Sequence, residues 1–119
     1  NEKQWQDLID FEGNANGFKI LTESKNGIEG GLRLSYATLG AFTKYPKESL
    51  PKKPSQQISD KKFGFFQTEK DFFIEVASEL GLISNGKNGD ISYLRHPLTF
   101  LVEAADDICY TIIVRIYCV

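Results

Sequence analysis

The stretch RHPLTFLVEAADDICY, residues 95–110, decides the fold class because it has the residue spacing of a long helix. Pro97 suits the first position of a helix, where its missing N–H would have no partner anyway. No glycine or proline follows it. Apolar residues then recur every three or four positions, namely Leu98, Leu101, Val102, Ala105, Cys109 and Ile112. The pattern predicts a helix with one buried face.

A second stripe of the same helix contains Thr99, Glu103, Asp106 and Tyr110. At about 100° per residue, Asp106 lies at the edge of the apolar face, whereas Asp107 lies nearly opposite and can face water. A carboxylate at the edge of a core is costly to ionise without a cation or hydrogen-bond donors. Asp106 is therefore a candidate metal ligand, with the ring of Tyr110 one turn away. An ordinary polar flank of a helix remains the alternative.

Length and composition indicate one domain at most, because the chain has 119 residues. Its 41% hydrophobic and 25% charged residues are ordinary for a globular protein. No run of residues predicts a membrane span and none resembles a secretory leader. The two cysteines form no CxxC pair and predict no disulfide framework. We therefore expect a cytoplasmic protein without membrane association.

Charge is distributed unevenly, although the formal net charge is only −2. Residues 44–62 contain six lysines and two acids, a local charge of +4, and acids predominate from Asp71 onward. A basic connection opposite an acidic helical half suits an anionic ligand together with a cation. A solvated lysine-rich loop is the alternative.

Shorter helices are predicted before the deciding stretch. Residues 2–10 carry apolar residues at helical spacing. Ser35 can cap a helix that runs to Thr43. Thr68, with an aspartate three residues later, can begin another, which Gly81 ends. The predicted buried faces contain Tyr36, Leu39 and Phe42 in the earlier helix, and Phe72, Phe73, Val76, Ala77 and Leu80 in the later one.

The remaining segments contain residues that disfavour helices. Residues 11–18, FEGNANGF, continue the helical spacing, but two glycines and two asparagines oppose it. Close backbone approach by another helix or by a ligand would explain this composition, and a frayed helix start or a turn is the alternative. Residues 26–31, 48–60 and 85–90 are rich in turn formers and predict loops. Residues 114–119 are β-prone.

Four segments resemble, in the same order, the dGTP triphosphohydrolases of the HD-domain phosphohydrolase superfamily. They are EGNANG at 12–17, LSYATLGAFTKYP at 34–46, KKFGFF at 61–66 and HPLTFLVEAADDICY at 96–110. The matching segments extend from Phe11 to about Ile113. The resemblance implies an all-α fold, with residues 1–119 forming a single partial helical domain. About four to five helices and a long basic loop are expected.

The resemblance also implies roles for particular residues. Members of this family hydrolyse a deoxynucleoside triphosphate, here expected to be dGTP, to the deoxynucleoside and tripolyphosphate. Asn14 matches a residue at the nucleotide site, and Lys44 and Lys62 match lysines that contact the polyphosphate. Tyr110 would place its ring against the sugar. Asp106 matches the last metal ligand, and no residue of this chain matches a catalytic one.

Most of the implied metal centre lies outside this sequence. The family's other ligands, one His and a His-Asp pair, and its catalytic His would precede Asn1. His96, the only histidine, is expected to cap or pack at the helix start. A single carboxylate, Asp106, cannot hold a catalytic divalent ion. We therefore expect the chain alone to be inactive and to bind no metal, with Mg²⁺ or Mn²⁺ present only in the complete enzyme.

The expected partners follow from the same resemblance. They are a deoxynucleoside triphosphate, the upstream HD-containing part of the enzyme, and a second copy of the chain. The alternative is a non-catalytic helical module that binds a nucleotide or a protein.

Overall fold

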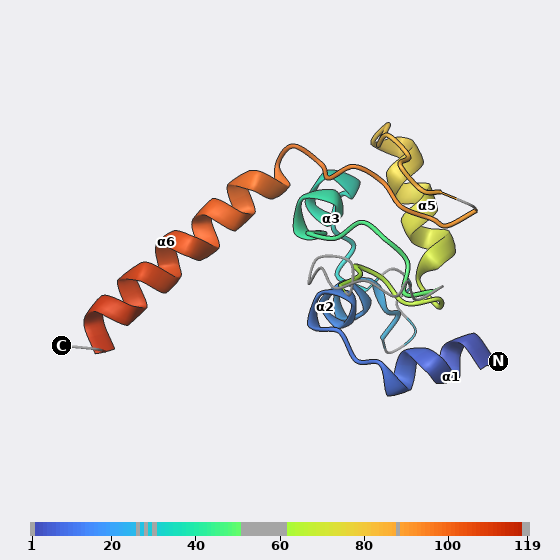
Figure 1. The fold of residues 1–119 in the computed structure, drawn as a ribbon, viewed down its shortest axis with the longest axis horizontal. Helices are drawn as coiled ribbons and strands as arrows, with labels where there is room; N and C mark the ends of the chain where they lie inside the picture. The colour runs from blue at the N-terminus through green and yellow to red at the C-terminus, as the bar shows by residue number, and fades with distance from the viewer. Residues whose placement is uncertain are drawn as a thin grey trace.

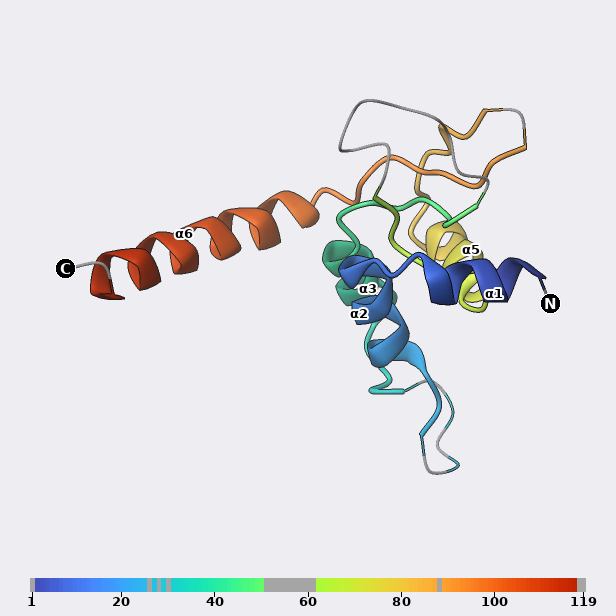
Figure 2. The ribbon, with the colours of Figure 1, turned by 60° about the horizontal axis from the view of Figure 1, so that its bottom comes forward.

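The computed structural model describes residues 2–25, 27, 29, 31–50, 62–87 and 89–117. Within these residues, five helices are joined by loops and isolated β-bridges. The helices are α1 (Glu2–Ile9), α2 (Gly13–Thr22), α3 (Tyr36–Phe42), α5 (Lys70–Glu79) and α6 (Thr99–Tyr117). Helices α2, α3 and α5 form the body, α1 lies at one edge, and α6 projects away from the other (Figure 1, Figure 2). The predicted all-α class is confirmed.

The predicted loop at 48–60 lies mostly outside the described residues, which resume at Lys62. The lysines Lys52, Lys53 and Lys61 therefore also lie outside them. Of the six lysines in residues 44–62, the described structure includes Lys44, Lys47 and Lys62.

Side-chain caps set the starts of α2 and α3. Ser35 caps α3 as predicted, because its Oγ accepts a hydrogen bond from the backbone N–H of Thr38 at 3.2 Å. Glu12 caps α2 through Oε2, which accepts from the backbone N–H groups of Asn14 at 2.8 Å and Ala15 at 3.3 Å. These bonds satisfy N–H groups that have no partner inside the helix.

Helix α5 begins one residue later than a Thr68 cap would place it. Its cap residue is Glu69, and the Thr68 hydroxyl donates to Glu69 Oε1 at 2.6 Å. The predicted Thr68 cap is therefore wrong, because that hydroxyl is bonded to a carboxylate. The predicted end of the helix is confirmed. Gly81 follows it with φ +62°, a conformation that glycine adopts without steric cost.

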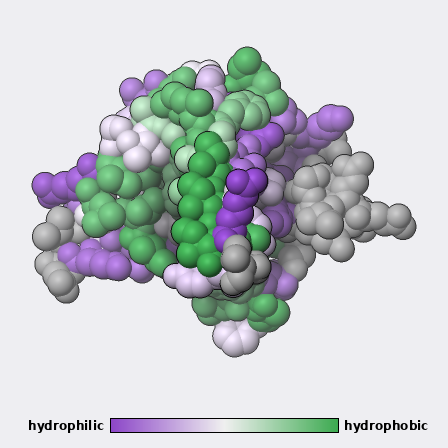
Figure 3. All heavy atoms as spheres, turned by 90° about the vertical axis from the view of Figure 1, so that its left-hand side faces the viewer, coloured by the Kyte–Doolittle hydropathy of each residue, from purple (hydrophilic) through white to green (hydrophobic). Residues whose placement is uncertain are grey.

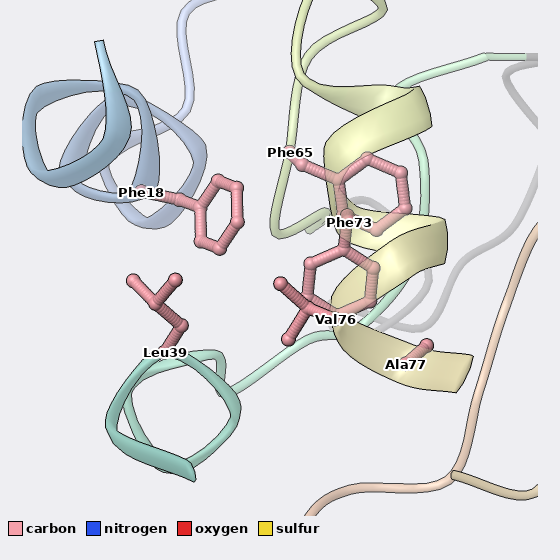
Figure 4. Close-up of a cluster of buried hydrophobic side chains, with 6 residues drawn as sticks. All are labelled: Phe18, Leu39, Phe65, Phe73, Val76 and Ala77. Carbon is pink, nitrogen blue, oxygen red and sulfur yellow. The ribbon is translucent and has the colours of Figure 1, made fainter. Parts of the chain in front are cut away.

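The core lies where α2, α3 and α5 meet (Figure 4). Its buried side chains are Phe18, Leu39, Phe65, Phe73, Val76 and Ala77. The rings of Phe65 and Phe73 stack with centroids 4.3 Å apart, and Phe18 meets Phe73 edge-on at 5.4 Å. Burying one such side chain contributes about 1.5–3 kcal/mol, so this cluster stabilises the body on which the loops rest.

Glycines in α2 and α3 allow these elements to pack closely. A Cβ atom on Gly17 would lie 2.6 Å from Phe42 Cζ, and one on Gly40 would lie 2.6 Å from Leu80 Cδ1. The structure therefore shows close approach by another helix in the glycine-rich segment 11–18, one of the two explanations predicted for it.

Helix α6 differs from the prediction at both ends. It begins at Thr99, and Pro97 lies in the preceding turn. It continues to Tyr117, so the predicted extended end is wrong for residues 114–117, while 118–119 lie outside the described residues. β-Branched residues oppose a helix by less than about 1 kcal/mol each, and this segment contains no glycine or proline to end it.

Among the described residues, α6 contacts the body near its start, through Thr99 and through Glu103, which pairs with Lys44. Thr99 is 1% exposed, and its hydroxyl donates to the backbone carbonyl of Gly40 at 3.2 Å. Beyond it the predicted buried face is exposed, with Leu101 at 66% and Ile112 at 52%. Figure 3 shows hydrophobic residues gathered on the side of the molecule from which α6 projects. The predicted burial of the stripe is therefore wrong for the described residues.

None of the described helices combines the length and the apolar character needed to cross a bilayer.

Candidate functional site

A cavity of about 450 Å³ lies beside the first turns of α6. Four cationic side chains and one carboxylate line it, from Lys44, Lys47, Lys62, Arg95 and Glu103. The lining also includes Tyr45, Pro46 and Ser92. Among these lining residues the positive charges outnumber the negative one, so the cavity favours an anionic ligand.

Backbone hydrogen bonds bring the cavity's segments together. The N–H of Gly64 donates to the carbonyl of Lys47 at 3.0 Å, and the N–H of Tyr93 donates to the carbonyl of Pro46 at 2.9 Å. Residues 45–48 therefore lie between the segments that contain Gly64 and Tyr93. This arrangement explains how cations far apart in the sequence come to share one cavity.

Gly64 allows the closest of these approaches. A Cβ atom there would collide with the Tyr45 carbonyl and lie 2.7 Å from Thr43 Cγ2. The approach places the ammonium of Lys62 5.5 Å from the centre of the Tyr45 ring, and that of Lys44 6.0 Å from it. Both distances are within the range of cation–π attraction, so the Tyr45 ring attracts both ammonium groups.

Glu103 joins two of the cations with one carboxylate. Its Oε1 lies 2.9 Å from Lys44 Nζ, and its Oε2 lies 2.7 Å from Arg95 Nη1. The hydrogen bond with Lys44 lowers the pKa of Glu103, and the charge of Arg95 lowers it further. The same hydrogen bond raises the pKa of Lys44. Both groups are therefore charged at neutral pH.

The predicted polyphosphate contacts, Lys44 and Lys62, are brought together in this cavity. Asp106 lies farther along α6 and is exposed, so its predicted half-burial is wrong for the described residues. The reason is that α6 projects from the body with this part of its surface uncovered. The Asp106 charge still contributes to the raised pKa of Lys44, after the larger effect of Glu103. Its role as a metal ligand stays a prediction.

The other two predicted substrate residues do not line this cavity. Asn14 lies in the first turn of α2, where its Nδ2 donates to Glu12 Oε1 at 2.9 Å. Tyr110 lies on α6 and is 70% exposed. Their predicted contacts with a nucleotide stay predictions.

The sequence did not predict roles for Arg95 and Glu103. Glu103 shares a helical stripe with Asp106, so its position near the site could have been found from spacing. Arg95 precedes the helix, and no periodicity indicates where its side chain lies. Its guanidinium is held 4.7 Å from the centre of the Phe100 ring. His96 Nδ1 accepts a hydrogen bond from the N–H of Leu98 at 3.2 Å, as expected for a residue at a helix start.

Among the residues that the structure describes, no three His, Cys, Asp or Glu side chains gather as a possible metal site. Catalytic metal sites generally use several protein ligands together with open positions. The described donors therefore do not fit a divalent ion, because Asp106 has no companions of this kind.

Fold and cavity together define a helical protein with a pocket that is lined mainly by cationic side chains. No family model matches the chain. It is 48% identical over 123 aligned positions to a deoxyguanosinetriphosphate triphosphohydrolase-like protein of Synechocystis, covering 95% of this chain and 27% of that protein. A protein of the same name from Pseudomonas aeruginosa is 40% identical over 116 positions, with 95% and 25% covered.

The name of a third relative lacks the ending "-like protein". It is the deoxyguanosinetriphosphate triphosphohydrolase of Yersinia pestis, 35% identical over 109 positions, covering 89% of this chain and 19% of that protein. The chain spans about a quarter of the length of the first two relatives. It is therefore homologous, over nearly all of its own length, to one section of dGTP triphosphohydrolase-like proteins.

Proposed function

We propose that this chain forms the polyphosphate-binding part of a deoxynucleoside triphosphate triphosphohydrolase. The names of its relatives support this class of enzyme. One structural observation carries the assignment to this cavity. Lys44 and Lys62, which the family resemblance assigns to the polyphosphate, lie in the same cationic cavity together with Arg95.

The cavity's chemistry is binding and orientation. An ammonium group is a compact charge on a flexible stem, so Lys44 and Lys62 can follow the oxygens of a triphosphate chain. Cations beside the phosphates also favour the negative charge that develops during phosphoryl transfer. Attraction alone does not activate water, so hydrolysis would need groups supplied by other parts of the protein. Asp106 would ligate a metal only together with those groups.

The proposal is tested by titrating the 119-residue chain with inorganic tripolyphosphate in a calorimeter, with EDTA present. Lys44→Gln and Lys62→Gln should each weaken binding about tenfold, because each removes a charge-assisted contact. The control is Lys87→Gln, which changes an exposed lysine outside the cavity and should leave binding unchanged. Absence of binding by the unaltered chain, or equal weakening by the control, would contradict the proposal.

The enzymatic part is tested with a second polypeptide that carries the upstream His and His-Asp pair. Mixing the two should give metal-dependent hydrolysis of dGTP, and Asp106→Ala should abolish it. The alternative, a non-catalytic nucleotide-binding module, predicts instead that dGTP binds with the same affinity with and without Mn²⁺. If hydrolysis persists in the Asp106→Ala variant, Asp106 is not a ligand of the proposed metal centre.

A further inference from the structure

One carboxylate occupies a cavity that is otherwise lined by cations and neutral groups. Glu103 contacts Lys44 with one oxygen and Arg95 with the other, at 2.9 and 2.7 Å. It thereby satisfies two cations with a single negative charge, and Lys62 lies in the same lining. A ligand with several anionic oxygens could contact all three cations, whereas the carboxylate contacts two.

These ion pairs contribute little to folding. The side chains of Lys44, Glu103 and Arg95 are 41%, 25% and 38% exposed. Ion pairs of this exposure are weak because water screens the charges and ordering the side chains costs entropy. The arrangement therefore has more consequence for what the cavity binds than for the stability of the fold.

Arg95 is held in an orientation suited to phosphate. Its guanidinium lies over the Phe100 ring at 4.7 Å while Nη1 contacts Glu103. A guanidinium has five N–H donors in a planar fork that matches the oxygens of phosphate, often two at a time. Held by the ring, the fork can exchange a carboxylate for a phosphate without a large rearrangement, which reduces the entropy cost of binding.

We infer that Arg95 is a third polyphosphate-binding residue, and that Glu103 is an internal anion which the polyphosphate displaces from Arg95 and Lys44. The inference rests on the proposed function of the cavity and extends it to these two residues. In the absence of ligand Glu103 keeps the two cations close together. When polyphosphate binds, its oxygens take over the contacts that the carboxylate makes.

The test uses tripolyphosphate titration of the 119-residue chain in EDTA. Arg95→Gln should weaken binding about tenfold, and Arg95→Lys should weaken it less, because the charge is kept and the fork is lost. Glu103→Gln should tighten binding several-fold, because its competing charge is removed. The control Glu79→Gln removes an exposed carboxylate at the end of α5 and should have no effect.

A double variant shows whether Glu103 acts through Arg95. In the Arg95→Gln background, Glu103→Gln should give a smaller gain in affinity than in the unaltered chain. Circular dichroism melting of each variant should match that of the unaltered chain, which separates altered binding from altered folding.

The outcomes distinguish this inference from the proposed function. If Lys44→Gln weakens binding and Arg95→Gln does not, the cavity binds polyphosphate without Arg95. This result would overturn the inference about Arg95 and leave the proposed function standing. If Glu103→Gln weakens binding or leaves it unchanged, the displacement of Glu103 is overturned. If the unaltered chain binds no tripolyphosphate, the inference and the proposed function are both overturned.

Discussion

At the scale of single residues, Gly64 determines how closely the cavity's segments approach. Gly64→Ala should destabilise the chain by about 1–3 kcal/mol, the usual cost of overpacking. The added Cβ atom would collide with the backbone of Tyr45, which cannot rotate away as a side chain can. Because Tyr45 lies between Lys44 and Pro46 in the lining, tripolyphosphate binding should weaken as well. Urea denaturation and calorimetry measure the two effects.

A matched glycine provides the control for this substitution. Gly13 is the first residue of α2, and a Cβ atom there would have nothing within 4 Å. Gly13→Ala should be neutral or stabilise by up to about 1 kcal/mol, because alanine favours a helix more than glycine. Equal losses of stability in the two variants would mean that close approach at Gly64 is not the cause.

At the scale of elements, Glu48 joins the cavity's central segment to α5 and to the segment that contains Ile91. The carboxylate is buried, with Oε2 2.8 Å from Lys70 Nζ and 3.1 Å from Gln67 Nε2. Its Oε1 accepts the N–H of Ile91 at 2.6 Å. Burial alone would raise the pKa of Glu48, but bonds from Lys70, Ile91 and Gln67 together lower it below the ordinary 4.5.

This lowered pKa predicts how stability depends on pH. A carboxyl that is more acidic in the folded state contributes its full stabilisation above the unfolded pKa, and loses it as pH falls through the folded pKa. The free energy of unfolding should therefore decrease as pH falls below about 4.5. Glu48→Gln should cost about 1–3 kcal/mol at pH 7 and make the acid decline shallower. An unchanged acid slope in urea titrations would exclude Glu48 as its source.

Helix positions could be predicted where the signals are local. The Ser35 cap of α3 and the Gly81 end of α5 depend on nearby residues, and both are confirmed. The start of α5 was mispredicted because the Thr68 hydroxyl bonds to Glu69. Spacing cannot show which of two adjacent polar residues will cap a helix.

The cavity could be predicted only in part, because loops build most of it. The family resemblance indicated Lys44 and Lys62. No local pattern shows that the segment with Lys62 packs beside residues 45–48, which directly follow Lys44. The contact between Lys44 and Glu103 depends on how α6 meets the body, where Thr99 also bonds to the carbonyl of Gly40. Such contacts follow from tertiary packing, which periodicity does not describe.

At the scale of the whole molecule, α6 is the least covered element of the described structure. Apolar side chains occupy most of its circumference, including Ile108, Ile113 and Ile116 at 60%, 54% and 65% exposure. A wide apolar face of a helix is ordinarily buried, and extended apolar surface marks a site of interaction. The described fold therefore leaves α6 with surface that a second polypeptide can cover.

We predict that the 119-residue chain self-associates through α6. Burying one apolar side chain contributes about 1.5–3 kcal/mol, so a few paired residues along a helix this long can offset the entropy lost on association. Leu101→Glu combined with Ile112→Glu should reduce the mass measured by light scattering to that of a monomer and leave the helical circular dichroism signal unchanged. Both positions lie on the same face, so the two charges would be buried without partners in the associated state.

Ser78→Glu provides the control, because it adds a charge at an exposed position of α5, away from α6. This variant should keep the mass of the unaltered chain, and its sedimentation should show the same dependence on concentration. A monodisperse monomer formed by the unaltered chain would contradict self-association. Loss of association in the Ser78→Glu variant as well would mean that net charge, rather than the apolar surface of α6, controls it.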